Sequence, residues 1–199
     1  QDRMPEPIDK LTAAVHHYDA VAAARPDARV RPVEPTDIAR CVELVNRTHH
    51  GLDLFRPYTV GFLEGRLDDG CWGPKPSFVA PVYGWPDLHV LEDGGEVVAC
   101  AGLWDRGRDL REQWRHRTTG EEREVTSACV LDLGFAEGRA DAMAALLGDL
   151  AAGTAALGRT TLVVALEFLP DVQGAVAWAE PTVERRHLET IMFGEPGFE

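Results

Sequence analysis

Two carboxylates lie where apolar strands are expected to position them. Asp132 lies within an apolar run, between Leu131 and Leu133, and Glu167 directly follows the apolar run 160–166. Alternation along a strand would place Asp132 on the face opposite the two leucines. A carboxylate in apolar surroundings is suited to accept a proton near neutral pH, so Asp132 and Glu167 are candidate general bases. The alternatives are an ion-paired, structural Asp132 and a solvated Glu167 at a strand end.

A second group of chemically capable side chains lies between residues 46 and 58. It combines polar, charged and aromatic types: Asn46, Thr48, His49, His50, Asp53, Phe55, Arg56 and Tyr58. Of these, Asp53 and Tyr58 are candidates for contact with a small ligand. The alternative is a surface loop that is anchored by an aromatic residue.

The charge of the chain restricts its partners. Asp and Glu number 33 against 20 Lys and Arg, which gives a formal net charge of -13 and a pI near 4.9. Nucleic acids and anionic membranes require a basic face, so we expect neither as a partner. An acidic surface would attract cationic ligands such as amines; the alternative is that it serves solubility alone.

Cysteine and histidine positions do not suggest a metal site. The cysteines form no C-x-x-C pair, and the histidines at 16–17 and 49–50 are adjacent rather than one helical turn apart. Adjacent side chains on a helix point away from each other, so we expect no bound metal. The chain has no long apolar run and no signal-peptide pattern, which predicts a cytoplasmic location. Because it begins with Gln1, we interpret it as a fragment or a processed piece.

The N-terminal part is predicted to form a helix outside the main pattern. Residues Ile8 to Ala24 carry apolar side chains at helical spacing, and Pro26 ends that spacing. No strand is expected beside this helix. We therefore interpret residues 1–27 as a linker or arm and residues 28–199 as the main domain.

The main domain alternates strands and helices. Its front half is expected to contain a strand at 28–33, a helix of about three turns from Ile38, a helix at 59–67 and a hairpin of strands 88–92 and 96–104. Its back half is expected to contain strand 125–135, helix 140–157, strand 160–166, a short helix at 170–178 and a strand at 185–193. This order predicts a mixed α/β domain with an antiparallel front half and a βαβ back half.

The same order of elements resembles the GNAT acyltransferase superfamily over residues 28–193. The segment V-R-P-V-E-P-T-D-I at 30–38 resembles the first strand and helix entry of that family, where R-P-x-x-x-x-D is common. The hairpin with V-A-C-A-G-L at 98–103 resembles its second and third strands, and the unit 125–166 resembles its fourth strand, third helix and fifth strand. The resemblance implies a GNAT-like α/β fold whose two central strands splay apart. The helix before it would suit the connector of a tandem GNAT protein, with this chain as the C-terminal lobe.

The resemblance implies an acyl-CoA site between strands 125–135 and 160–166. In the family the pyrophosphate rests at the start of the third helix, where unpaired amides and the helix dipole favour an anion. The implied cofactor-binding residues are Phe135, Gly138, Arg139 and Ala140. Gly138 and Ala140 match the family loop Q/R-x-x-G-x-G/A, whereas Phe135 replaces its leading Gln or Arg.

Two acids and a missing tyrosine bear on activity. Glu137 and Asp141 would compete with a pyrophosphate at the helix start, at about 0.3–1 kcal/mol per charge, and Arg139 would offset part of this. The alternative is that Asp141 caps the helix and that the loop binds no CoA. Many members of the family use a tyrosine in the short helix after the fifth strand as the acid, and this chain has Trp178 near that place.

The resemblance thus implies an acyl-CoA-dependent N-acyltransferase. Acetyl-CoA would be the co-substrate and a small amine the acceptor, which would attack the thioester directly while backbone amides stabilise the oxyanion. The loop with Asp53 and Tyr58 would shape the acceptor pocket. The alternative is a catalytically degenerate lobe with a structural role beside an active second GNAT lobe or in a homodimer. A third interpretation is an unrelated α/β protein that binds a small ligand.

Overall fold

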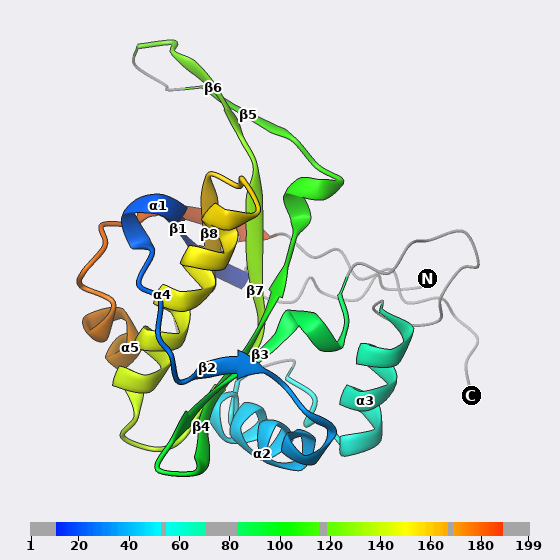
Figure 1. Ribbon diagram of the computed structural model, residues 1–199. Coiled ribbons are helices and arrows are strands. Elements are labelled where there is room, and N and C mark those ends of the chain that lie inside the picture. The colour runs from blue at the N-terminus through cyan, green and yellow to red at the C-terminus, as the bar shows by residue number, and fades with distance from the viewer. Residues whose placement is uncertain (1–10, 53–54, 71–82, 116–118, 167–168, 189–199) are drawn as a thin grey trace, which may run out of the picture.

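A seven-stranded mixed sheet forms the centre of the protein (Figure 1). The computed structural model describes residues 11–52, 55–70, 83–115, 119–166 and 169–188. The strands follow the order β2-β3-β4-β7-β8-β1-β9. Their bounds are β1 Leu11–Asp19, β2 Val30–Pro32, β3 Leu88–Asp93, β4 Glu96–Trp104, β7 Ser127–Phe135, β8 Thr161–Val164 and β9 Thr182–Leu188. A separate two-stranded hairpin is formed by β5 (Glu112–Arg115) and β6 (Glu122–Val125) and projects from one end of the molecule (Figure 1).

Strand direction divides the sheet as the sequence predicts. The pairs β2–β3, β3–β4 and β4–β7 are antiparallel, and β7 pairs with β8 in parallel. The parallel pair is joined through helix α4 (Ala140–Ala156), which makes the βαβ unit. The antiparallel front half and the βαβ back half are therefore confirmed. The remaining helices are α1 Ala20–Ala23, α2 Ile38–Thr48, α3 Val60–Asp69 and α5 Pro170–Ala175.

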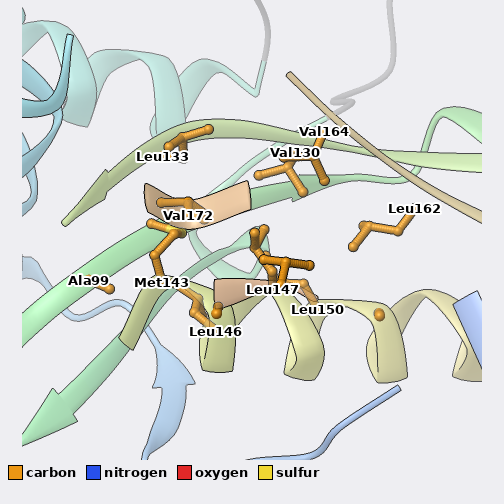
Figure 2. Packing of buried hydrophobic residues seen from close by; sticks show 14 of the residues in the cluster. Ala99, Val130, Leu133, Met143, Leu146, Leu147, Leu150, Leu162, Val164 and Val172 are labelled. Atoms are coloured by element: carbon orange, nitrogen blue, oxygen red, sulfur yellow. The ribbon is translucent and has the colours of Figure 1, made fainter. Parts of the chain in front are cut away.

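Helices cover both faces of the sheet (Figure 1). Helix α4 packs on one face with α1 and α5, and its side chains Met143, Leu146, Leu147 and Leu150 are at most 1% exposed. Figure 2 shows these residues turned towards Val130, Leu133, Leu162 and Val164 of the sheet. A helix that is apolar nearly all round must be buried, and each such leucine contributes about 1.5–3 kcal/mol by leaving water. Helices α2 and α3 cover the other face over a second apolar cluster.

The helix predicted over Ile8–Ala24 is wrong for most of its described residues, because only Ala20–Ala23 are helical, as α1. Residues Leu11–Asp19 form strand β1, which pairs antiparallel with β8 on one side and with β9 on the other. His16, His17 and Tyr18 are consecutive and all are less than 9% exposed. An interior strand buries both of its faces, so it lacks the two-residue alternation that would distinguish it from a helix in the sequence. The predicted arm 1–27 therefore contributes an interior strand of the sheet.

The R-P-x-x-x-x-D pattern has a local physical reason. Arg31 Nη1 in β2 donates to Asp37 Oδ2 at 2.7 Å, just before α2 begins at Ile38. Asp37 also accepts a hydrogen bond from the backbone N–H of Glu34 at 2.8 Å. These contacts hold the turn between β2 and α2, so the motif positions the first helix against the sheet.

No helix in the described ranges is long and apolar enough to cross a lipid bilayer.

The sequence predicts the final strand at 185–193. Strand β9 begins three residues earlier, and residues 189–193 lie outside the described part of the chain. The polar segment before residue 125, for which the sequence predicts no element, contains the β5–β6 hairpin.

Candidate active site

Strands β7 and β8 diverge after three paired positions. Their register runs from Ser127↔Thr161 to Cys129↔Val163, whereas β7 continues to Phe135. Beside the far end of β7 lies a cavity of about 180 Å³, lined by Arg47, Thr48, Phe135, Ala136, Glu137 and Leu169. The splayed pair of central strands that the resemblance implies is therefore present, and it leaves the second half of β7 without β8 as a partner.

Asp132 forms a bulge in β7. Cys100 and Gly102 of β4 pair with Gly134 and Leu131, so β7 contains one residue more than β4 over this stretch. The backbone of Asp132 has φ 50°, a left-handed value found at no other non-glycine residue that the structure describes. Aspartate is among the few residues that adopt this conformation readily, because its short polar side chain bonds locally.

The bulge changes which face each β7 side chain occupies. Leu131 packs with the cluster under α2 and α3, whereas Leu133 packs with the cluster under α4. The expectation that these two leucines share a face opposite Asp132 is therefore wrong. Strict alternation fails here because the extra residue shifts the pleat by one position.

Asp132 lies in a buried ion pair with Arg66 of α3. Both terminal nitrogens of the guanidinium approach it, Nη1 to Oδ1 at 2.8 Å and Nη2 to Oδ2 at 2.8 Å, and the Arg66 and Asp132 side chains are 3% and 1% exposed. The Tyr58 hydroxyl donates to Asp132 Oδ1 at 2.8 Å and accepts from Arg66 Nη1 at 3.1 Å. Three donors thus surround the carboxylate, which corresponds to the ion-paired alternative; its role as a general base stays a prediction.

Two tyrosines border this ion pair. Burial, and next the nearby charge of Asp132, raise the pKa of Tyr58 to about 12, so its hydroxyl remains protonated and able to donate. The Arg66 guanidinium lies 5.3 Å from the centre of the Tyr83 ring. A Cβ on Gly102 would lie 2.2 Å from the Tyr83 hydroxyl, so the glycine is required for Tyr83 to occupy this place.

Arg66 is a site residue that was not predicted from the sequence, and Tyr83 lies beside the same ion pair. The signal for Arg66 was available, because helical spacing places it on the same face as Leu63 and Leu67. A basic residue on the apolar face of a helix requires a buried acid as its partner. The partner itself is 66 positions away in the sequence, so only the tertiary structure identifies it.

The start of α4 carries more carboxylates than cations. Gly138 has φ 70° and Arg139 is the N-cap residue. Arg139 Nη2 bonds Asp93 of β3 at 2.7 Å, and Arg139 Nε bonds Asp141 at 3.1 Å. The hydrogen bond from Arg139 lowers the pKa of Asp141, which keeps that carboxylate charged beside the helix start. An incoming phosphate would therefore compete with two carboxylates for Arg139.

The other candidate residues are placed as follows. Phe135 lines the cavity beside β7, and its backbone N–H donates to the Thr48 hydroxyl at 3.0 Å. Ala140 is the first residue of α4. Tyr58 meets Asp132 directly. Asp53 and Glu167 lie outside the described residues. Within the described ranges no three potential metal-ligating side chains come together.

His49 is a further titratable group beside this site. Its Nδ1 lies 2.9 Å from the carbonyl oxygen of Val45, so Nδ1 carries the hydrogen, and its ring stacks on Phe55 with centroids 5.1 Å apart. Burial lowers the pKa of His49 below its usual 6.5, although the Val45 carbonyl and the charge of Asp132 act in the opposite direction. Burial therefore favours the neutral imidazole over the charged form in the folded protein.

This lowered pKa gives the stability a pH dependence of defined sign. As the pH falls below about 6.5, the unfolded chain takes up a proton at His49 before the folded chain does, so the free energy of unfolding decreases. A His49→Asn variant keeps a donor for the Val45 carbonyl but does not titrate, and we expect a shallower loss of stability. Urea unfolding of both proteins at a series of pH values measures this. A variant with the wild-type slope would contradict the assignment, and His50→Asn, at an exposed neighbour, is the control.

No family model and no curated protein matches the chain. Among solved structures it is similar to Saccharomyces cerevisiae N-myristoyltransferase with bound myristoyl-CoA, at 12% identity and a TM-score of 0.50, covering 86% of this chain and 49% of that one. A second structure of that enzyme with myristoyl-CoA matches at 12% identity, a TM-score of 0.49 and coverage of 86% and 46%. A putative GNAT-family acetyltransferase from Novosphingobium aromaticivorans matches at 14% identity, a TM-score of 0.45 and coverage of 92% and 67%.

These likenesses concern the fold. The chain spans about half the length of the myristoyltransferase structures that it matches. Strand order, the βαβ back half and the divergence of β7 from β8 agree with the GNAT-like fold that the sequence predicts, and the fold class is confirmed.

Proposed function

We propose that this chain is an acyl-CoA-dependent N-acyltransferase lobe that transfers an acyl group, acetyl in the simplest case, to a small amine. The observation that supports this best is the divergence of β7 from β8 beside a cavity at the end of β7. The similar myristoyltransferase structure contains an acyl-CoA. An extended acyl-thioester arm lying against β7 would find backbone groups that β8 does not pair.

The proposed reaction is a direct transfer. The neutral amine nitrogen attacks the thioester carbonyl carbon, the C–N bond forms, the C–S bond breaks and the CoA thiolate leaves. Backbone N–H groups of β7 near the Asp132 bulge are proposed to donate to the oxyanion, because a bulge re-aims backbone groups that a regular strand would pair. Tyr58 and Asp53 are proposed to contact the acceptor.

The proton released by the amine requires a base. Asp132 is surrounded by three donors, so the proposal gives it the role of positioning Tyr58 and Arg66. Glu167, which follows the buried residue Leu166, is the proposed base. The two carboxylates selected from the sequence thus receive different roles.

The second candidate function is a degenerate lobe with a structural role beside an active partner. It is favoured by the pairing of Arg139 with Asp93 and Asp141, which leaves that guanidinium already neutralised at the implied pyrophosphate site. The two functions differ in whether the chain alone binds acyl-CoA.

Calorimetric titration of acetyl-CoA into the folded chain separates these candidates. On the first, the wild type binds, and Asp141→Asn binds about two- to fivefold more tightly because one competing charge near the helix start is removed. Glu121→Gln, an equal charge change on the distant β5–β6 hairpin, is expected to leave the affinity unchanged.

A matched pair at Gly138 tests where the phosphates lie. Residue 138 has a left-handed backbone, which aspartate and asparagine adopt about equally well. The variants Gly138→Asp and Gly138→Asn therefore differ mainly in charge. We expect the aspartate variant to bind acetyl-CoA about two- to fivefold more weakly than the asparagine variant. Equal affinities would place the phosphates elsewhere, and no heat at millimolar acetyl-CoA would favour the degenerate lobe.

A further inference from the structure

A cavity of about 560 Å³ lies at the start of α3. It is lined by Phe55, Arg56, Pro57, Tyr58, Thr59 and Phe62. This volume falls within the range of about 300–1,000 Å³ that small-molecule sites occupy. Because the Tyr58 hydroxyl is already bonded to Asp132, its ring is the part of the side chain that remains for contact with a ligand.

Three aromatic rings form the apolar part of this wall. The Tyr58 ring lies 4.9 Å from that of Phe62 and 5.9 Å from that of Phe55, measured between centroids. Phe55 is in turn supported by the stacked His49 ring. Phe62 is nevertheless 50% exposed. A planar apolar ligand would cover this ring, which contributes both buried area and the tilted ring contacts that aromatic groups prefer.

The polar part of the wall is cationic. Arg56 is exposed, and no carboxylate within the described ranges pairs with it, although the chain carries a net charge of -13. A guanidinium binds a carboxylate through two parallel hydrogen bonds, and it repels a ligand that is only cationic. The wall therefore favours a ligand that combines a ring with a carboxylate over a simple amine.

We propose that this cavity binds the acceptor of the acyl transfer and that the acceptor is an aromatic amino acid or a close analogue. Its ring would lie among Phe55, Tyr58 and Phe62, its carboxylate on Arg56, and its amine would be the nucleophile. This inference rests on the proposed function for the amine, but ring and carboxylate recognition are properties of the cavity alone. The product would be the N-acylated amino acid.

Three probes separate the recognition elements by calorimetry in the absence of acyl-CoA. L-phenylalanine carries the ring, the carboxylate and the amine; 3-phenylpropionate lacks the amine; 2-phenylethylamine lacks the carboxylate. We expect the first two to bind the wild-type chain more tightly than the third. Arg56→Gln should weaken the binding of L-phenylalanine and 3-phenylpropionate about tenfold, because a charge-assisted hydrogen bond at an exposed site is lost. The affinity for 2-phenylethylamine should stay unchanged or improve.

Phe62→Ala is expected to weaken the binding of all three probes, because each probe carries a phenyl ring. Val60→Ala, an exposed apolar residue of the same helical turn that does not line the cavity, is the matched control and should change none of them. Equal affinities of wild type and Arg56→Gln for 3-phenylpropionate would overturn carboxylate recognition. If none of the three probes binds the wild-type chain, the proposal is overturned.

The acetyl-CoA titration keeps the two proposals distinguishable. Binding of acetyl-CoA without binding of L-phenylalanine would overturn this inference and leave the acyltransferase intact. If L-phenylalanine binds and acetyl-CoA does not, the proposed ligand class is supported, but its role as the acceptor of an acyl transfer is overturned. If both bind, N-acetylphenylalanine should form from the pair, and Arg56→Gln should raise KM for phenylalanine about tenfold with little change in kcat.

Discussion

Replacement of Asp132 by asparagine is expected to lower the free energy of unfolding by about 3–5 kcal/mol. The Arg66 guanidinium, 3% exposed, would then be buried without a counter-charge. Asparagine adopts the left-handed backbone of residue 132 as readily as aspartate does, so the bulge itself should survive. The loss would therefore report the ion pair, and urea unfolding followed by circular dichroism measures it.

A double-mutant cycle tests this explanation. Arg66→Met removes the buried cation, and the combination of Arg66→Met with Asp132→Asn should be more stable than Asp132→Asn alone. If the losses in the free energy of unfolding of the two single variants add up to that of the double variant, a direct charge pair is contradicted. Glu124→Gln breaks the exposed pair with Arg111 and should cost less than about 1 kcal/mol, which provides the surface control.

The second large effect is expected at Gly134 of β7. A Cβ at this position would lie 2.4 Å from the backbone nitrogen of Val45 and 2.6 Å from the carbonyl carbon of Leu44, both in α2. Backbone cannot rotate away as a side chain can, so Gly134→Ala must displace α2 from the sheet. We expect a loss of about 1–3 kcal/mol in the free energy of unfolding.

The same substitution should disturb the proposed site. Phe135, the next residue, donates its N–H to Thr48 of α2, and both line the cavity beside β7. We therefore expect Gly134→Ala to weaken acetyl-CoA binding as well as the fold. Gly65→Ala in α3 is the control: nothing lies within 4 Å of its Cβ, and a helical alanine should stabilise by up to about 1 kcal/mol. A Gly134→Ala protein as stable as wild type would contradict the close approach.

The sequence by itself determined the local elements and their order. The hairpin β3–β4, the long apolar helix α4 and the buried strand β8 could be predicted because each depends on a short run of residues and its turn. The order of those elements was enough to predict a mixed α/β domain with a βαβ back half, whereas the GNAT-like fold and the divergence of its two central strands were implied by the resemblance to that superfamily.

Tertiary structure alone decided the features that depend on distant partners. Strand β1 is a strand because β8 and β9 lie on either side of it; its own residues fit a helix equally well. Asp132 meets Arg66 because a bulge turns it towards α3, and Arg139 meets Asp93 because β3 lies beside the start of α4. Backbone periodicity is a local property, whereas charge pairing and strand neighbours are set by packing between segments far apart in the chain.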